Sequence, residues 1–510
     1  MIVMNASNDT ADSLHLDGYD QDAPPGSWTQ MPQLATRSFS RAMAPLPLEL
    51  DRAGRTPLAV QIYGAIREAI VTRRLVPGAK LPSWRDLAIQ LGISRGTVRA
   101  AYERLINEEL AIGQGAAGTR VAQSPPRSAT ARLSSEAPPL PELFFYGFGV
   151  VPMAFQMGVP SQDAFPSKLW SRIVSHAARQ AAVAPVSYPD PRGEPDLRNE
   201  IAAYLGITRG IRCNPSQVLV TGGLSNALYL AVRGLQLDGL TAWMEEPGFP
   251  ITRTALSLSG MTVAAVSVDP EGLDVAAGFR NAPEAALAVV TPGQQAPLGM
   301  TMSTPRRLAL IAWARRNGAW IIEDDYLSEL KLEGRAAPAL ASLDSGGRVL
   351  HIGSFSKTIS PTLRLGFLVV PPDHARRFGE LAACLAPAPS VSVQYAVAAF
   401  LREGHYLRHL RHMKRLYATR RSALLRCLGE VASNSLTVTP TAGLAVVIHL
   451  PEVASDATIA SRALSFGLAP CPLSLWYMQS ASQQGLLLGV TNLNEQRLPA
   501  ECHRLAELVR

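Results

Sequence analysis

The sequence predicts a multidomain protein in which a small α+β winged helix-turn-helix domain precedes a large α/β domain. Its 510 residues correspond to about two to four domains at roughly 100–200 residues each. The composition, 47% hydrophobic and 17% charged, is that of a chain that buries a core. Short helical patterns over residues 51–122 end in a glycine-rich hairpin, whereas apolar strands alternate with long helical stretches over residues 144–510.

The basic excess of the chain is concentrated in the first of these domains. The formal net charge is +7, and residues 51–122 hold eleven Arg and Lys against six Asp and Glu. A concentrated basic segment favours a nucleic-acid partner for that segment. A solvated basic surface is the alternative.

The cysteines and the N-terminus indicate the compartment. Five cysteines are scattered without paired or metal-type spacing, which disfavours both a disulfide framework and a zinc site. The N-terminal residues include acids where a signal peptide has a basic start and an apolar run. Residues 381–401 are uncharged but too polar for a membrane span. We therefore expect a cytoplasmic protein without a membrane partner.

Two segments connect or precede the domains. Residues 1–50 are polar and rich in Pro and Gly, which predicts a flexible N-terminal arm. Residues 123–143 are rich in Pro, Ser and Ala, which predicts an extended and partly restricted linker.

The elements of the first domain follow from local signals. A helical apolar pattern begins near Thr56 and stops before Pro77. A second helix starts at the Ser83-x-x-Asp86 signal and is closed by Gly92. Ser94 caps a third helix, and residues 110–121 read as a β-hairpin wing. Two helices joined by a tight turn make a helix-turn-helix, and the hairpin makes it winged.

A lysine marks the chemistry of the large domain, because the chain has only five lysines. Lys357 follows the apolar strand VLHIG, at a strand end where α/β sheets bind ligands. Nearby Ser354, Ser356 and Arg364 supply hydroxyls and a cation suited to a phosphate. An amine beside a phosphate pocket is what pyridoxal 5'-phosphate requires.

Two further strand ends supply matching groups. Asp324 and Tyr326 follow the strand that begins at Trp320, and a carboxylate there can keep a pyridine nitrogen protonated. Residues 218–228 form a strand that enters a helix through two glycines. The free amides of Gly223, Leu224 and Ser225 suit a phosphate.

The first domain resembles the winged helix-turn-helix of GntR-type bacterial regulators. The resemblance covers residues 56–121 and rests on LPSWRDLAIQLGISRGTVRAAYERL at fixed spacing. Trp84 departs from the small residue usual there, and we expect it to pack at the helix end, with DNA contact as the alternative. The resemblance implies a double-stranded DNA operator as partner. The residues it places at DNA are Arg85, Ser94, Arg95, Thr97 and Arg99.

The ordered motifs of residues 145–510 resemble the fold-type I aminotransferase domain of MocR-type regulators. These motifs are YPDPRG, TGG, EEPGFP, TPGQQAPLGMTMS, EDDY and SFSKTISPTLRLG. The resemblance implies a homodimer that binds pyridoxal phosphate. It also implies that Lys357 forms the Schiff base, and that Asp324, Tyr326 and Phe249 contact the ring at its nitrogen, its hydroxyl and its face, respectively. The phosphate is then held by Ser354, Ser356, Arg364 and the amides of residues 223–225. Tyr188 reaches across from a partner subunit.

Some positions depart from that family. Gln294 and Ala296 stand where histidine and tyrosine are common, and Ala445 stands where histidine is common. The stretch GLLLGVTNL carries no arginine for a substrate carboxylate, so an α-carboxylate ligand is not assured. His405, His409 and His412 lie at helical spacing without cysteine or carboxylate partners, so we expect a solvated helix and no metal.

Three functions remain open at this point. The first is a transcription regulator whose aminotransferase-like domain binds pyridoxal phosphate and senses a small amine or amino acid. The second is an active aminotransferase with an appended DNA-binding domain. The third, a regulator with an empty pocket, is disfavoured by the set Lys357, Asp324, Tyr326 and Arg364.

Overall fold

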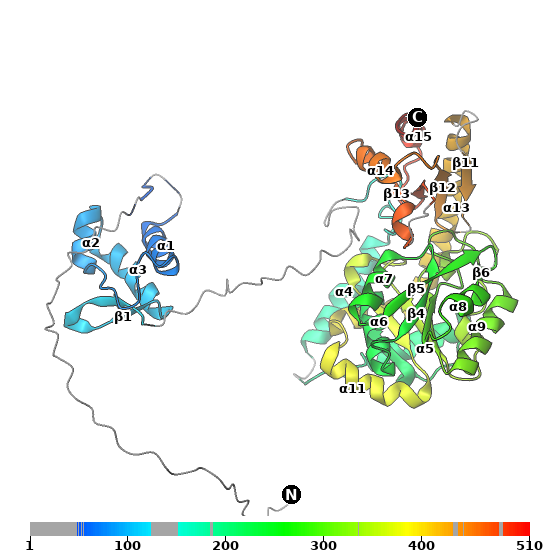
Figure 1. Cartoon of the computed structure of the whole chain (residues 1–510), viewed down its shortest axis with the longest axis horizontal. Helices are drawn as coiled ribbons and strands as arrows, with labels where there is room; N and C mark the ends of the chain where they lie inside the picture. The colour runs from blue at the N-terminus through cyan, green and yellow to red at the C-terminus, as the bar shows by residue number, and fades with distance from the viewer. Residues whose placement is uncertain are drawn as a thin grey trace, which may run out of the picture. The chain divides into compact units, whose positions relative to one another are not determined.

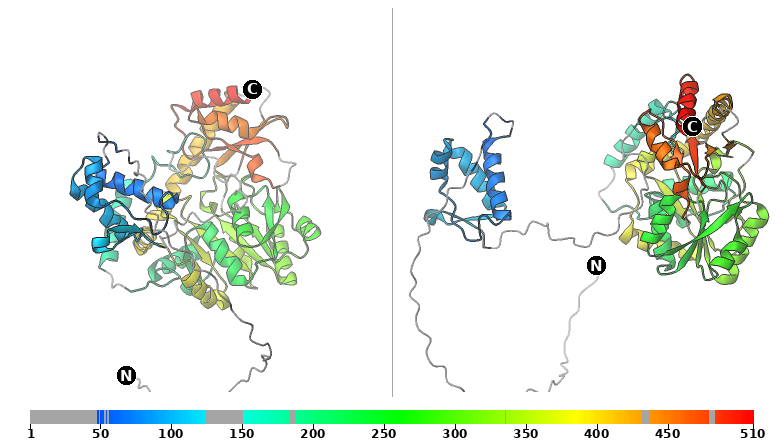
Figure 2. Two further views of the ribbon diagram at one scale, coloured as in Figure 1. Left: turned by 60° about the vertical axis from the view of Figure 1, so that its left-hand side comes forward. Right: turned by 45° about the horizontal axis from the view of Figure 1, so that its top comes forward.

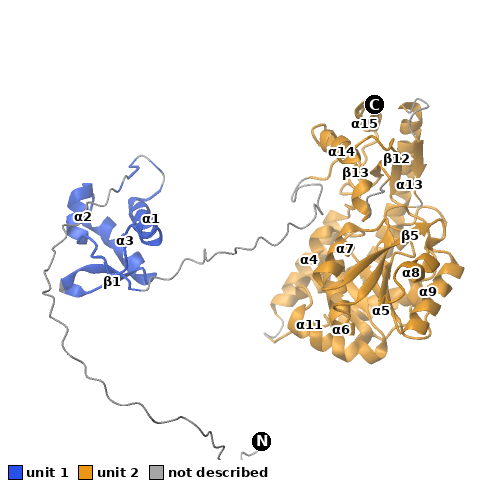
Figure 3. Ribbon diagram, in the orientation of Figure 1, with its two compact units in different colours: residues 1–137 blue, residues 138–510 orange. Residues whose placement is uncertain are grey.

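The computed structural model divides the chain into two compact units, residues 1–137 and residues 138–510 (Figure 3). Nearly all of the arm expected over residues 1–50 and of the linker expected over residues 123–143 lies outside the described residues. No helix among the described residues is long and apolar enough to cross a membrane. The structure describes residues 48, 50–52, 54, 56–123, 151–183, 187–334, 336–431, 437–441, 443–478 and 483–510.

Unit 1 folds into three helices followed by an antiparallel hairpin (Figure 1). Its elements are α1 (Leu58–Val71), α2 (Trp84–Leu91), α3 (Arg95–Asn107), β1 (Ala111–Gly113) and β2 (Thr119–Val121). The Ser83 hydroxyl caps α2 by accepting from the Asp86 amide at 3.1 Å, and Gly92 ends this helix at φ +61°. The predicted winged helix-turn-helix is confirmed.

A small core holds unit 1 together. Ile62 and Ile66 of α1 pack with Val98 and Leu105 of α3, and all four side chains are fully buried. Val121 of β2 closes the same core, so the wing is fixed to the helices by burial of its apolar end.

Unit 2 is built on an eight-stranded mixed sheet with the order β3-β10-β9-β8-β7-β4-β5-β6. The five strands from β9 to β5 in this order are parallel, and β10 runs antiparallel to both of its neighbours. The strands are β3 (Val218–Thr221), β4 (Thr241–Glu246), β5 (Thr262–Asp269), β6 (Gly272–Leu273), β7 (Leu287–Val290), β8 (Trp320–Asp325), β9 (Val349–Ser354) and β10 (Gly366–Val369).

Helices cover both faces of this sheet because its strands are apolar on both sides. Leu219 of β3 belongs to the core beneath α6 and α11, whereas Val218 and Val220 belong to the core beneath α5 and α12. The helices of unit 2 are α4 (Ser167–Ala182), α5 (Pro195–Thr208), α6 (Leu224–Leu235), α7 (Pro250–Leu258), α8 (Val275–Asn281), α9 (Thr304–Asn317), α10 (Leu340–Leu343), α11 (Ala375–Leu385), α12 (Val391–Arg402), α13 (His405–Val431), α14 (Asp456–Leu464) and α15 (Leu498–Val509).

A second, antiparallel sheet occupies one end of unit 2, shown in orange and red in Figure 2. Helix α13 runs from α12 to this end and packs against α15. The strand order is β11-β12-β14-β13, with β11 (Thr437–Pro440), β12 (Ala445–His449), β13 (Cys471–Pro472) and β14 (Gly485–Gly489).

The cap of α2 gives a test of the first unit. Replacing Ser83 with Ala removes the acceptor of the Asp86 amide and should lower the stability of α2 by about 1 kcal/mol. Ser83→Asn keeps an acceptor at this position and is the matched control. Hydrogen exchange of the α2 amides measures the change, and equal protection in the Ala and Asn variants would contradict the capping role.

Candidate functional site

The site lies where β8 and β9 end side by side. These strands are parallel, and Asp324 pairs in register with Ile352 of β9. Lys357 follows β9 and donates a hydrogen bond from Nζ to the Gly158 carbonyl oxygen at 2.9 Å. Gly158 lies at φ +77°, a conformation that favours glycine, and a Cβ there would stand 2.8 Å from Nζ, so Lys357 would have to shift. Carboxyl ends of parallel strands thus bring the predicted amine and carboxylate to one edge of the sheet.

Asp324 is buried without a protein donor. Its side chain is 5% exposed, and no residue in the described part of the chain hydrogen-bonds its carboxylate. Burial, together with the charges of Asp325 and Glu245, raises the pKa of Asp324 to about 7, and Lys357 opposes this rise. Burial lowers the pKa of Lys357, and Asp324 opposes that shift. A buried carboxylate needs a partner, so this geometry fits a ligand that presents an N–H to Asp324.

The two neighbouring acids of β8 are held by the protein itself. Glu323 accepts from the Leu340 and Ala341 amides and lies 3.0 Å from Nδ1 of His351. Asp325 accepts from Nε of Arg209 at 2.6 Å. Successive side chains of a strand point to opposite faces, so Asp324 alone faces the site. Burial lowers the pKa of His351, but the carboxylates of Glu323 and Asp325 outweigh it and the net shift is upward.

Glu245 is a buried acid that the sequence analysis did not single out. It is the last residue but one of β4 and accepts from the Thr291 amide at 3.1 Å and the Thr291 hydroxyl at 2.5 Å. Burial raises the pKa of Glu245 to about 7. Its signal in the sequence was a second strand, TAWMEE, that ends in carboxylates.

Tyr326 and Phe249 flank this cluster. Tyr326 is half-buried, and burial together with the charges of Asp324 and Glu245 raises the pKa of its hydroxyl above 10. Phe249 is the residue before α7, and its ring centroid lies 5.5 Å from that of Trp476. Both aromatic rings pack against the same small apolar cluster, which places them on a shared surface.

The predicted phosphate ligands come from three adjacent strand ends. Gly366 of β10 pairs with Thr221 on one side and Ser354 on the other. A Cβ at residue 366 would stand 2.8 Å from the Gly353 carbonyl and 3.2 Å from Cα of Gly223. The absence of that atom lets the start of α6 approach the end of β9.

The donors at this place are available to an anion. Helix α6 begins at Leu224 after Gly223, without a side-chain cap, so the first amides of the helix, including Ser225, have no helical partner. The Ser354 hydroxyl accepts from the Ser356 amide at 3.2 Å. Arg364 is exposed at φ +47°, and in the described part of the chain its guanidinium makes no hydrogen bond or ion pair. The structure therefore brings together, at three adjacent strand ends, the backbone segments that carry the predicted anion ligands.

Tyr188 differs from the other predicted ligands, because its side chain is fully exposed to solvent. One chain alone does not bury it in a site.

Unit 1 presents the predicted DNA-contacting residues on its surface. Arg85, Arg95 and Arg99 are exposed, and Nε of Arg99 lies 2.8 Å from Glu103 one helical turn away. The Ser94 hydroxyl accepts from the Thr97 amide at 3.1 Å and so caps α3. Trp84 is half-buried against the core of unit 1, as expected.

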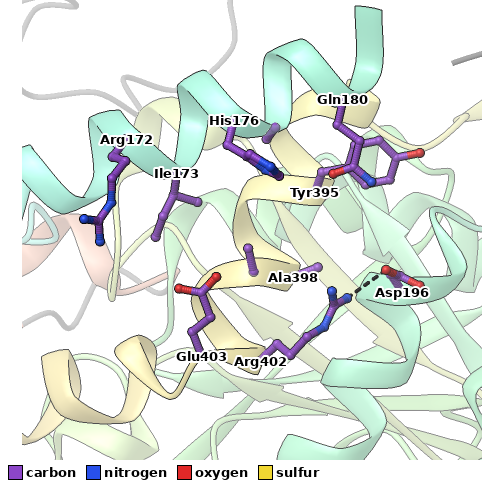
Figure 4. Close-up of a pocket in the computed structure, with 11 residues that line it drawn as sticks. Arg172, Ile173, His176, Gln180, Asp196, Tyr395, Ala398, Arg402 and Glu403 are labelled. Carbon is purple, nitrogen blue, oxygen red and sulfur yellow. Dashed lines mark hydrogen bonds and ion pairs between the residues drawn. The ribbon is translucent and has the colours of Figure 1, made fainter. Parts of the chain in front are cut away.

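A hollow of about 310 Å³ lies elsewhere on unit 2, between α4, α5 and α12 (Figure 4). Arg172 and His176 of α4 line it, and Arg402 bridges Asp196 at 2.7 Å across it. It shares no residue with the Lys357 site.

The histidines of α13 correct one expectation. His409 is 5% exposed, and its Nε2 lies 2.9 Å from the Thr358 carbonyl, so the expectation of a solvated helix is wrong for this residue. The aromatic rings of Phe165 and Phe400 surround it. Helical periodicity alone does not tell which face of a helix packs. In the described ranges, no group of three His, Cys, Asp or Glu side chains is arranged to hold a metal.

Family models match both units. Residues 58–121 match the model of bacterial regulatory proteins of the gntR family, and residues 162–467 match the model of class I and II aminotransferases. An archaeal alanine:glyoxylate aminotransferase superposes with a TM-score of 0.65 at 24% identity, over 71% of this chain and 91% of its own. A multiple-substrate aminotransferase from Thermococcus profundus gives 0.64 at 24% identity, over 75% and 96%.

Relatives of the whole chain are regulators by name. The probable rhizopine catabolism regulatory protein MocR of Rhizobium meliloti is 35% identical over 88% of this chain and 93% of its own. The pyridoxine biosynthesis regulator PdxR of Corynebacterium glutamicum is 30% identical over 89% and 97%. The regulator TauR of Rhodobacter capsulatus is 32% identical over 76% and 83%.

The fold and the matches define the class of protein as a DNA-binding regulator fused to an aminotransferase-like domain. The chain belongs to the MocR-type branch of the gntR family of transcription regulators. The family and the fold class predicted from the sequence are confirmed.

The raised pKa of Asp324 gives a prediction for the ligand-free protein. Between the unfolded pKa near 3.9 and the folded pKa of about 7, the folded state binds more protons, so the unfolding free energy falls as pH rises. Asp324→Asn carries no such proton. Its unfolding free energy should exceed that of wild type by an amount that grows between pH 5 and pH 7 and then levels off. Urea denaturation at each pH measures this, and a difference independent of pH would contradict it.

Proposed function

We propose that unit 2 binds pyridoxal 5'-phosphate through Lys357 and senses a small amine or amino acid. The observation that carries this proposal is the buried carboxylate of Asp324, which lacks a protein donor beside the Lys357 amine. When bound, the cofactor supplies an electrophilic carbon for amines and a ring that withdraws electrons.

Different residues of unit 2 bind the ring and the phosphate of the cofactor. Asp324 would accept the ring N–H, and its ionised form is the one that can keep the ring nitrogen protonated. Tyr326 directs its hydroxyl to the ring oxygen, and Phe249 stacks on the ring. Ser354, Ser356, Arg364 and the amides of residues 223–225 bind the phosphate.

Exposure of Tyr188 supports a homodimer. A fully exposed tyrosine next to a structured segment is available to a second subunit, where its hydroxyl can reach a phosphate. We therefore assign it to the site of the partner subunit.

Unit 1 binds an operator on double-stranded DNA through α3 and the start of α2. Arg85, Arg95 and Arg99 contact the major groove, and Ser94 and Thr97 contact phosphate at the start of α3. Because the whole-chain relatives are named as regulators, an aminotransferase with a DNA-binding appendage is not favoured.

The cofactor gives the first test. Purified protein should absorb near ~420 nm, as pyridoxal linked to a lysine does. Lys357→Ala should lose this band, because no amine replaces Nζ. Lys331→Ala, which removes another partly buried lysine of unit 2, is the control and should keep it. A wild-type protein that stays colourless with added pyridoxal phosphate would refute the proposal.

Helix α3, which carries Arg95 and Arg99, gives the second test. Arg95→Ala and Arg99→Ala should each weaken operator binding by about 1–3 kcal/mol if the arginine reads a base. Both side chains are exposed, so the thermal unfolding temperature should stay within a degree or two of wild type. Gel-shift titration and thermal denaturation measure the two quantities. Parallel loss of folding and binding would show a structural role instead.

A further inference from the structure

A buried apolar cluster stands directly beside the proposed ring site. We call it the apolar wall, and it packs against both Phe249 and Tyr326. It joins the segment after β7 to the small sheet. Its members are Ala296, Val447, Leu473, Trp476 and Leu487.

Strand register decides which side chains of the small sheet belong to this wall. Leu487 of β14 pairs with Val447 of β12 and with Cys471 of β13. The alternate residues Leu486 and Leu488 belong instead to the main core on the other side. The face toward the proposed site is therefore apolar at its centre. His449, the basic residue in these three strands, is hydrogen-bonded to Thr439.

The half-buried residues on this wall are apolar as well. Met157, Leu298, Leu475 and Tyr477 pack against it. Met157 directly precedes Gly158, whose carbonyl accepts from Lys357. The residue that contacts the amine is therefore the chain neighbour of a residue that packs against the apolar wall.

Two arginines donate hydrogen bonds to carbonyl oxygens in segments that neighbour the apolar wall. Arg253 donates to the Tyr477 carbonyl at 3.0 Å. Arg421 donates to the Thr441 carbonyl at 2.8 Å and to Glu333 at 2.6 Å.

One polar group at this place is a neutral amide, and Nη2 of Arg209 would lie 3.6 Å from a Cβ at the neighbouring residue 293. Gln294 is 5% exposed, and its Oε1 is buried without a hydrogen-bond partner. A Cβ at residue 443 would stand 1.8 Å from its Nε2, so Gly443 makes room for this side chain. An amide can hydrogen-bond a ligand but cannot neutralise a carboxylate.

The charges nearby point the same way. Burial, together with the nearby charges of Asp325 and Glu245, raises the pKa of Asp324. A ligand carboxylate beside them would be desolvated against an apolar wall and repelled by buried acids, whereas an ammonium group would be attracted.

We infer that the effector of this chain is a primary amine with an apolar substituent and no carboxylate on the carbon that bears the amine. Leu487 belongs to the apolar wall and lies in the stretch that carries no arginine, so we assign this preference to Leu487. This inference rests on the proposed binding of pyridoxal phosphate to Lys357.

Matched pairs of compounds test it in the full-length protein loaded with pyridoxal phosphate. Isoamylamine is compared with leucine, and phenethylamine with phenylalanine, by the shift of the band near ~420 nm. Each amine should reach half-saturation at a concentration at least about tenfold below that of its amino acid. Half-saturation by the amino acids at equal or lower concentrations would overturn this inference but not the proposed function. A band that neither amine shifts would do the same. A protein without the band overturns the proposed function and the inference together.

A gain-of-function variant tests whether Leu487 determines the preference for amines over amino acids. Leu487→Arg supplies the missing cation and should shift the preference toward the amino acids by about tenfold or more. Thr437→Arg adds the same charge at an exposed position of β11 and should keep the wild-type preference. Circular dichroism and gel filtration check folding. An unchanged preference in folded Leu487→Arg overturns the role of Leu487. If that variant does not fold, the comparison of amines with amino acids on the wild-type protein still tests the inference.

Discussion

Three consecutive carboxylates at the end of β8 are accommodated inside the protein, and the pleat of the strand divides them. Glu323 and Asp325 turn to one side, where Glu323 lies 3.0 Å from Nδ1 of His351 and one oxygen of Asp325 accepts from Nε of Arg209. Asp324 turns to the other side and has no protein donor in the described part of the chain. Burial of a carboxylate is costly, and we propose that a ligand that brings a donor offsets this cost. The placement of Lys357 and the open start of α6 are consistent with one such ligand.

Much of this site was predictable from the sequence because its residues follow strand ends. Asp324 and Lys357 each follow an apolar strand, and the carboxyl edge of a parallel sheet brings such residues together. The partners of the neighbouring acids were not predictable. Arg209 lies 116 residues from Asp325, and no local pattern announces that pair. His409 was misplaced for a related reason, since a helical period does not identify the buried face.

In the stretch around β14, strand register identifies which side chain belongs to the apolar wall, and the sequence motif alone does not. The stretch around β14 lacks an arginine, which the sequence shows directly, but its consequence depends on which leucine faces the site. The pairing of Leu487 with Val447 places it in the apolar wall, and Leu486 and Leu488 belong to the opposite core. With pyridoxal phosphate bound as we propose, an apolar wall beside Phe249 and Tyr326 favours an amine over an amino acid.

We propose that Lys357 couples effector binding in unit 2 to DNA binding by unit 1. Operator fragments selected by the full-length protein are titrated with wild type and Lys357→Ala, with and without the amine of lowest half-saturation. Linkage predicts that the amine changes wild-type operator affinity by about 5–150-fold. Lys357→Ala should bind the same fragments, because its winged helix is intact, and show no such change. The same change in both proteins, or none in wild type, would contradict the claim.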